Sequence, residues 1–175
     1  MSNSLFIIDI SSCTGCGTCN IACKERAGLP DELDFLRVEA YEEGKYPNPS
    51  LNYRVTHCFH CAQPACATAC PTDAILRRED GLVVIDAKKC IGCGDCIEAC
   101  PFEAIVMLPK NIAAKCDGCA DEVAIGWDPT CVRACPMRAL EYKPLAETQF
   151  SQRLKDTNLN DYGICPAVLY LLRSK

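Results

Sequence analysis

The sequence predicts an α+β fold made of two similar halves, each built from short strands around cysteine-rich loops. Two observations in the 175-residue chain predict it. Sixteen of the 17 cysteines fall into four groups of four. A short phrase, which is proline, two variable residues, alanine and an aliphatic residue, directly follows the last cysteine of three groups, at Pro71, Pro101 and Pro136. Such internal repetition indicates one structural unit that is used several times.

The spacing within the groups is typical of proteins that bind iron–sulfur clusters. The first and third groups are uninterrupted C-x2-C-x2-C-x3-C runs, and three groups end in Cys-Pro, which is the bacterial ferredoxin signature of [4Fe-4S] clusters. Glycines between the thiols, such as Gly15 and Gly92, allow positive φ and a close approach of the backbone. We therefore expect two ferredoxin-type halves with two [4Fe-4S] clusters each, or four clusters in all. The predicted metal ligands are Cys13, Cys16, Cys19, Cys23, Cys58, Cys61, Cys66, Cys70, Cys90, Cys93, Cys96, Cys100, Cys116, Cys119, Cys131 and Cys135.

The last cysteine of each run has a distinct expected role. Three residues separate it from the third cysteine, where a helical turn should start, so it should point away from the cluster that its neighbours hold. We expect it to ligate the cluster of a partner run, as in two-cluster ferredoxins.

Two other uses of cysteine compete with this interpretation. A disulfide framework is disfavoured because the N-terminus lacks a secretory pattern and the number of cysteines is odd. Structural zinc suits the last group taken alone, because its C-x2-C pair resembles a zinc knuckle. The other three groups, with their ferredoxin spacing, favour iron–sulfur clusters over a zinc-binding structural module.

Composition limits the partners and the setting. The net charge of -5 argues against a nucleic-acid partner. Basic residues near the cysteines, Lys115 and Arg133 among them, are expected to offset the negative charge of thiolate-bound clusters. No apolar stretch approaches the roughly 18 residues of a membrane helix, so direct membrane insertion is not expected. Reduced thiols and oxygen-sensitive clusters indicate a cytoplasmic, anaerobic setting.

The expected elements follow the cysteine groups along the chain. Residues 5–10 form an apolar strand that leads into the first loop, and residues 20–25 form a helical turn. Residues 24–57 are a long cysteine-free insert with turn signals and several aromatic residues, either a partner contact or packing over the clusters. Residues 74–78 and 82–86 flank Glu79-Asp80-Gly81, which is a hairpin signal.

The domain organisation divides near residue 143. Residues 1–143 are expected to form the four-cluster ferredoxin-like domain, with the insert at residues 24–57. Residues 144–175 are expected to form a C-terminal tail with two short helices at 145–155 and 167–173. Cys165 stands alone in this tail, so we interpret it as a small buried hydrophobe. His57 and His60 flank Cys58, and we interpret them as residues that tune a neighbouring cluster.

The chain shows no active site of its own. It contains no G-x-G-x-x-G, no P-loop and no nucleophile elbow, and no group of residues resembles a substrate site. The sequence therefore predicts a protein that carries electrons and is non-catalytic.

Several further motifs carry a family resemblance. The segments EEGKYPN at residues 42–48, HCFHC at 57–61, QPAC at 63–66 and KCDGC at 115–119, taken with the cysteine groups, resemble the iron–sulfur subunits of the dimethyl sulfoxide reductase family over residues 4–143. The resemblance implies that the first group pairs with the fourth and the second with the third. The implied ligand sets are Cys13, Cys16, Cys19 and Cys135; Cys23, Cys116, Cys119 and Cys131; Cys58, Cys61, Cys66 and Cys100; and Cys70, Cys90, Cys93 and Cys96.

The resemblance also implies a function and partners. Such subunits relay electrons between a large molybdenum- or tungsten-pterin catalytic subunit and a second redox partner. The chain lacks the long C-terminal extension of larger members, and so looks more like the compact small subunits of tungsten aldehyde oxidoreductases or class II benzoyl-CoA reductases. A free-standing polyferredoxin remains the alternative, and a zinc-binding module the third.

Overall fold

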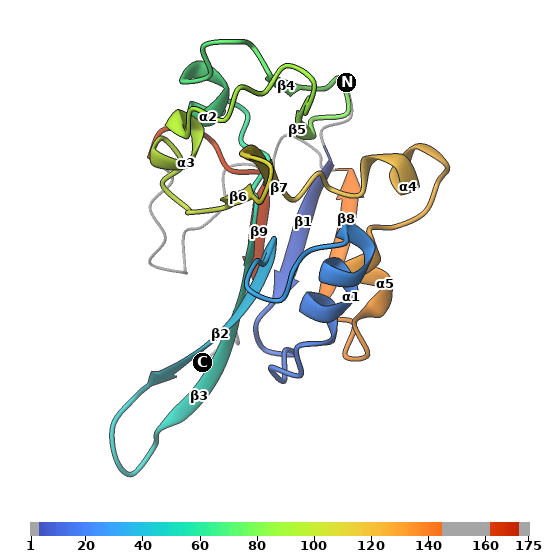
Figure 1. The fold of residues 1–175 in the computed structure, drawn as a ribbon. Coiled ribbons are helices and arrows are strands. Elements are labelled where there is room, and N and C mark those ends of the chain that lie inside the picture. The colour runs from blue at the N-terminus through green and yellow to red at the C-terminus, as the bar shows by residue number, and fades with distance from the viewer. Residues whose placement is uncertain (1–3, 145–161, 172–175) are drawn as a thin grey trace.

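A three-stranded sheet forms the centre of the protein in the computed structural model, which describes residues 4–144 and 162–171. Strand β1 (Ser4–Asp9) lies in the middle, antiparallel to β8 (Leu140–Pro144) on one side and parallel to β9 (Val168–Leu171) on the other (Figure 1). The strand predicted at residues 5–10 is therefore confirmed within one residue. Segments from both ends of the sequence meet in this sheet.

The main core lies on one face of this sheet. Phe6 and Ile8 of β1 are buried together with Leu140 and Val168, and cysteines of the first and fourth groups belong to the same cluster of side chains. Helices α1 (Thr18–Ala27) and α5 (Thr130–Ala134) pack against each other here. Burial of apolar side chains in this cluster favours folding.

Helix α1 is longer than the predicted turn at residues 20–25, and the residues at its two ends explain its bounds. Gly17 precedes it in the left-handed conformation, and Gly28 ends it with φ 59°. Glycine adopts such a conformation without steric cost, which is why it commonly follows a helix. Lys24 and Arg26 lie in the last turn, where positive charge interacts favourably with the helix dipole.

Two small hairpins follow one another in the middle of the sequence. Strands β4 (Ile75–Arg77) and β5 (Val83–Ile85) form one, and β6 (Ile105–Leu108) and β7 (Ile112–Lys115) form the other, each antiparallel. The hairpin predicted around residues 79–81 is confirmed. Short helices α2 (Ala65–Thr68), α3 (Asp95–Glu98) and α4 (Ala120–Ala124) precede or follow these strands.

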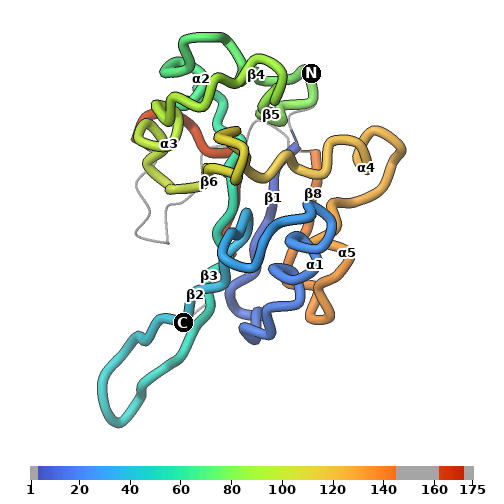
Figure 2. Tube along the Cα trace, viewed as in Figure 1, coloured from blue at the N-terminus to red at the C-terminus, as the bar shows by residue number. Residues whose placement is uncertain are grey.

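The insert forms a long hairpin, which is not among the elements expected from the sequence. Strands β2 (Leu36–Glu43) and β3 (Ser50–His57) pair in register from Leu36 opposite His57 to Glu43 opposite Ser50. The hairpin projects away from the body of the protein, and we call it the arm (residues 36–57; Figures 1 and 2). Residues 24–27 of the predicted insert instead complete α1.

The tail differs from its prediction. The helix expected at residues 167–173 is wrong, because residues 168–171 form β9. Val168 and Tyr170 are buried while Leu171 is exposed, and the Tyr170 hydroxyl donates a hydrogen bond to the Val55 carbonyl at 2.6 Å. This alternation buries one face against the core, which a helix at the edge of the sheet would not do. The helix expected at residues 145–155 lies outside the described residues.

Cys165 also differs from its prediction. Its side chain is exposed, so the interpretation as a buried hydrophobe is wrong. Its backbone carbonyl accepts a hydrogen bond from Ala62 at 2.9 Å, which ties the tail to the loop of the second cysteine group. Among residues 4–144 and 162–171, no helix combines the length and the apolar character that crossing a membrane requires.

Candidate metal centres

The sixteen predicted ligands gather at four places, which we call sites A to D. Three cysteines of one group and the last cysteine of its partner group meet at each site. Site A comprises Cys13, Cys16, Cys19 and Cys135; site B comprises Cys23, Cys116, Cys119 and Cys131; site C comprises Cys58, Cys61, Cys66 and Cys100; and site D comprises Cys70, Cys90, Cys93 and Cys96.

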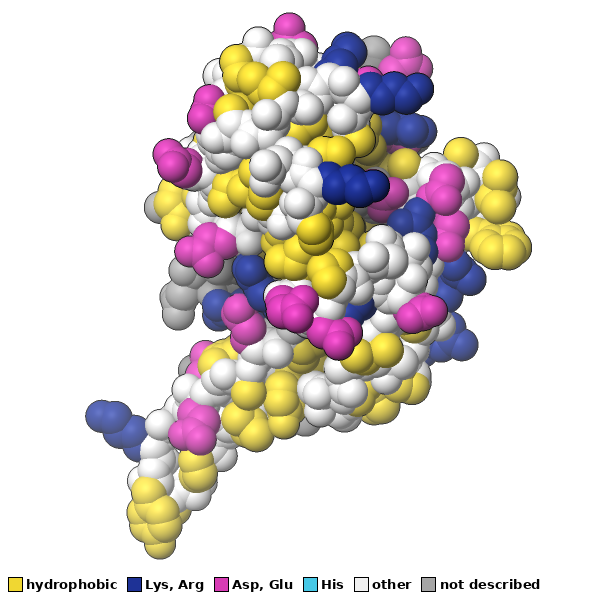
Figure 3. Space-filling model, in the orientation of Figure 1, with side chains coloured by type: hydrophobic (Ala, Val, Ile, Leu, Met, Phe, Trp, Pro, Cys, Tyr) yellow, Lys and Arg dark blue, Asp and Glu magenta, His cyan; other side chains and the backbone are white. Residues whose placement is uncertain are grey.

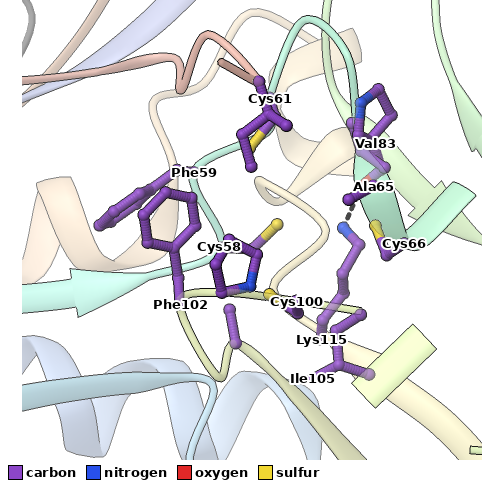
Figure 4. Close-up of a pocket in the computed structure, with 14 residues that line it drawn as sticks. Cys58, Phe59, Cys61, Ala65, Cys66, Val83, Cys100, Phe102, Ile105 and Lys115 are labelled. Carbon is purple, nitrogen blue, oxygen red and sulfur yellow. Dashed lines mark hydrogen bonds between the residues drawn. The ribbon is translucent and has the colours of Figure 1, made fainter. Parts of the chain in front are cut away.

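Sites A, C and D are cavities that are lined by their four cysteines and by apolar residues. Val38, Val55 and Leu140 complete site A, while Ile75 and Ile85 complete site D. In site C the four sulfur atoms face a common space between the second and third groups (Figure 4). These cavities place four thiols each around a space with few competing polar groups.

Site B is defined by the mutual influence of its thiols. Burial and then the negative charge of Cys119 raise the pKa of Cys23 to about 12. Burial followed by the charges of Cys23 and Cys119 also raises the pKa of Cys131. Cys116 is buried, and burial followed by the charges of Cys58, Cys23 and Cys131 raises its pKa. Cys23 therefore lies with the fourth group and not with its own.

The helices explain why each group divides in this way. Cys19 and Cys23 lie one turn apart on α1, and Cys131 and Cys135 lie one turn apart at the end of α5. Each helix therefore presents one thiol to site A and one to site B. Sites C and D are linked in a similar manner. Cys66 of α2 and Cys96 of α3 are each followed, just beyond the end of the helix, by a cysteine of the other site, Cys70 or Cys100. The structure thus groups the cysteines as the family resemblance implied.

Backbone amides donate to several of the sulfur atoms. Ala74 donates to Cys70 Sγ and Ala139 donates to Cys135 Sγ, both at 3.3 Å. The residue before each alanine, Asp73 or Arg138, has φ near 50°, which turns the alanine amide back toward the sulfur. The repeated phrase after Cys-Pro therefore places an alanine amide where it donates to the sulfur of the preceding cysteine. Further donors are Ala113 to Cys90, Gly118 to Cys116 and Thr130 to Cys119, each at 3.4 Å.

The electrostatics of the sites favour bound iron. Burial and the neighbouring thiolates raise the pKa of Cys19 to about 11 and that of Cys61 to about 12. Thiolates crowded in this way need a cationic partner, and iron supplies it when a cluster binds. Within the described residues, no three His, Cys, Asp or Glu side chains are placed to hold a single metal ion. The sulfur atoms instead line cavities, which suits a cluster with several iron atoms.

The two histidines are buried and hold the loop of site C. His57 Nδ1 donates to the Cys58 carbonyl at 2.7 Å, and His60 Nδ1 accepts a hydrogen bond from the Val83 amide at 3.0 Å. Burial lowers the pKa of His57 to about 4 and lowers that of His60 well below its usual value, so both rings are neutral near pH 7. They position the backbone beside Cys58. Their effect on a cluster stays a prediction.

Two basic residues have a greater role than their sequence positions indicate. Lys115 is one of several basic residues near the cysteines, yet it is buried beside site C. Arg26 is not among the residues singled out from the sequence. It contacts Asp117, Asp121 and Glu122 beside site B, and its distance from Glu122 is 3.4 Å. Its position three residues after Cys23 was the sequence signal that could have placed Arg26 near a metal site.

Comparison with known proteins agrees with this geometry. Four thiol sets, joined by short helices and covered by two-stranded hairpins, define a multi-cluster protein of the ferredoxin type. Two family models described as "4Fe-4S dicluster domain" match the protein, one over residues 50–144 and one over residues 12–74. Two dicluster domains imply four [4Fe-4S] clusters, which confirms the predicted cofactors and the two ferredoxin-type halves.

Relatives place the protein in a family. The B subunit of anaerobic dimethyl sulfoxide reductase from Escherichia coli is 44% identical over 151 residues, which is 81% of this sequence and 74% of that protein. The thiosulfate reductase electron transfer subunit of Salmonella typhi is 34% identical over 148 residues, or 82% and 77% of the two sequences. The formate dehydrogenase-O iron–sulfur subunit of Escherichia coli is 31% identical over 176 residues, or 89% and 59%. The chain belongs to this family of iron–sulfur electron-transfer subunits, as the sequence predicted.

Proposed function

We propose that this chain is the electron-transfer subunit of an oxidoreductase complex and that its sixteen grouped cysteines ligate four [4Fe-4S] clusters at sites A to D. Its catalytic partner is a large molybdenum- or tungsten-pterin subunit of the aldehyde oxidoreductase, benzoyl-CoA reductase or dimethyl sulfoxide reductase type. A second redox protein is the other end of the relay. The family membership and the names of the relatives support this assignment.

The arrangement of exposed thiols is the observation that carries the proposal. Of the sixteen grouped cysteines, Cys16 of site A and Cys93 of site D are exposed, and all the others are buried or partly buried. An electron carrier needs an entry and an exit near the surface, with the steps between them protected from solvent. Sites A and D can serve as entry and exit, and sites B and C are the protected steps between them.

The contacts between sites support a linear order from A to D. Helices α1 and α5 each contribute to both A and B. Cys58 of site C lies near enough to Cys116 of site B for its charge to raise the pKa of Cys116, after the larger effect of burial. Helices α2 and α3 join C and D, and these two helices contact each other. The two sites with an exposed thiol are thus the two ends of the series.

The chain's residues fix where electrons are held. A bound [4Fe-4S] cluster supplies one-electron redox chemistry, with a potential set by hydrogen bonds, charge and solvent exposure. The protein supplies the amide donors to sulfur described above, the apolar linings of Val38 and Val55 at site A, and those of Ile75 and Ile85 at site D. These groups exclude water and orient the thiols.

The arm offers a docking surface for the catalytic subunit. Its base lies against site A, because Val38 and Val55 line that cavity and the Tyr53 ring covers Gly15, where a Cβ atom would come within 2.3 Å. Its tip carries Tyr46, whose side chain is 95% exposed, and hydrophobic side chains gather there (Figure 3). A partner that holds this tip is brought beside the exposed end of the series at site A.

Iron and acid-labile sulfide analysis of anaerobically prepared protein tests the assignment. Four clusters require about sixteen iron atoms per chain. About eight iron atoms together with stoichiometric zinc contradicts the proposal. Co-purification with a large pterin subunit supports a dedicated subunit, whereas a monodisperse, cluster-loaded chain that exchanges electrons with several enzymes supports the polyferredoxin.

A further inference from the structure

Lys115 is a buried cation at the end of β7. Its side chain is 5% exposed, and it is one of three buried polar or charged residues within the described part of the chain, with His57 and His60. The ammonium donates hydrogen bonds to the Val83 carbonyl and to the Cys116 carbonyl, the latter at 3.0 Å. Burial of an ammonium is costly unless a negative charge lies nearby.

The described residues supply no carboxylate for Lys115. None of their ion pairs includes it, and both of its hydrogen-bond acceptors are neutral carbonyls. The neighbouring His57 and His60 are neutral, since burial and then the charge of Lys115 lower the pKa of both. The compensating negative charge must come from another group.

That group is the set of thiolates at site C. Lys115 lines the same cavity as the four cysteines of this site, and its side chain runs beside Cys66 and Cys100 with the nitrogen toward Val83 (Figure 4). The charge of Lys115 also opposes the effect of burial on Cys66, whose pKa is raised to about 11 by burial and by Cys58. The ammonium and the thiolates therefore lie close enough to interact.

The other sites differ in this respect. The linings of sites A and D contain no Lys, Arg, Asp or Glu. Arg26 lies near site B, but it adds no net positive charge to that region. Its guanidinium forms ion pairs with Asp117, Asp121 and Glu122. Among the described residues, Lys115 thus has no carboxylate partner, and its positive charge lies at site C.

We propose that Lys115 is the counter-charge of site C and raises the reduction potential of the cluster bound there. The inference rests on the ligand assignment proposed above. Reduction adds one electron and hence one negative charge, so a fixed cation nearby stabilises the reduced form more than the oxidised form. Lys115 is accordingly a potential-setting residue and not a catalytic one.

Four single variants of the complete, anaerobically purified chain test the proposal. Lys115→Met removes the charge and the donor, Lys115→Gln removes the charge and keeps a donor, and Lys115→Arg keeps the charge. Lys110→Met is the matched control, because Lys110 is exposed in the turn between β6 and β7 of the same hairpin. The reduced fraction of each cluster is followed by electron paramagnetic resonance while the potential is lowered with dithionite and mediators, at about pH 8, where histidine is neutral.

The expected result is a change at one cluster of the four. In Lys115→Met and Lys115→Gln, its ratio of reduced to oxidised form falls about tenfold at a fixed potential, which is a shift of about 59 mV to lower potential for a one-electron couple. Lys115→Arg and Lys110→Met leave all four midpoints near those of the unaltered chain. Loss of one cluster in Lys115→Met and Lys115→Gln, with retention in Lys115→Arg, also supports a required positive charge.

Other results overturn it. Unchanged midpoints in Lys115→Met and Lys115→Gln show that the charge does not act on a cluster. Equal shifts at all four clusters, or loss of one cluster in all three Lys115 variants, show a structural role only. The iron content of the unaltered chain tests the ligand assignment separately, so a failure of the proposed function is distinguishable from a failure of this inference.

Discussion

Cys131 and Cys135 lie one helical turn apart at the end of α5, and they belong to different sites. Cys131 lies with Cys23 and Cys119 in site B, whereas Cys135 lines site A. One short helix thus determines the spacing between two neighbouring sites. The same relationship holds for Cys19 and Cys23 on α1, so sites A and B share two helices and their separation is fixed twice.

The first prediction concerns this division. Cys135→Ala is expected to damage the cluster at site A, which is held by Cys13, Cys16 and Cys19 more than a hundred residues earlier. The iron content should fall from about sixteen toward about twelve atoms per chain, because one of four clusters is affected. Iron analysis with electron paramagnetic resonance measures the loss. Cys131→Ala is the matched variant and should damage site B instead. Equal damage to the same cluster by both variants contradicts the interleaved arrangement.

Cys165→Ala is expected to leave the iron content unchanged. Cys165 is exposed in the tail, and none of the three cysteine-lined cavities includes it. Its backbone carbonyl accepts a hydrogen bond from Ala62, and alanine keeps that carbonyl. Iron and sulfide analysis beside the unaltered chain measures the result. A loss of about four iron atoms in Cys165→Ala reveals a seventeenth ligand and a different ligand set.

Local spacing made much of the sites predictable. A C-x2-C-x2-C loop can reach around one cluster within a few residues, so the ligand types and the count of four clusters followed from the sequence. The hairpin at residues 79–81 was equally local, since Asp80 accepts from the Leu82 amide and Gly81 has φ 89°. Which group each last cysteine joins is decided by contacts far apart in the sequence, and the family resemblance alone predicted it.

Long-range packing decided what the sequence left open. Residues 168–171 are a short apolar run that suits either a helix or a strand, and pairing with β1, far away in the sequence, makes them a strand. The arm had a signal that was overlooked, because Leu36, Val38 and Ala40 alternate with charged residues. The burial of Lys115 had no such signal, since it depends on β5 and on three cysteine groups.

The tail strand provides a test of that packing. Tyr170→Phe removes the hydroxyl that donates to the Val55 carbonyl and leaves this buried acceptor without its donor. The expected loss is about 1–3 kcal/mol in the free energy of unfolding. Thermal unfolding under anaerobic conditions should show a melting temperature lower by about 2–4 °C per kcal/mol for a chain of this size. Leu171→Ala, at the exposed end of β9, is the control with little change. Equal melting temperatures for both variants contradict a stabilising role for the Tyr170 hydroxyl.

The last prediction concerns the arm and the catalytic subunit. Tyr46→Glu places a charge at the exposed tip, where an enduring interface is expected to have an apolar centre and to bury more than about 2,000 Å². Tyr41 is a less suitable target, because the Arg54 guanidinium stacks over its ring at 5.0 Å. The variant should lose the large subunit during purification yet keep about sixteen iron atoms, since the tip lies outside all four ligand sets.

Lys110→Glu is the control for the charge itself, because Lys110 is exposed on a different hairpin. It should co-purify with the large subunit as the unaltered chain does. Size-exclusion chromatography of the complex with an iron assay on each fraction separates the outcomes. If Tyr46→Glu keeps the large subunit at full stoichiometry, the tip of the arm is not the docking element. If Tyr46→Glu instead loses iron together with the subunit, the arm stabilises site A through Val38 and Val55 and does not act as an independent contact.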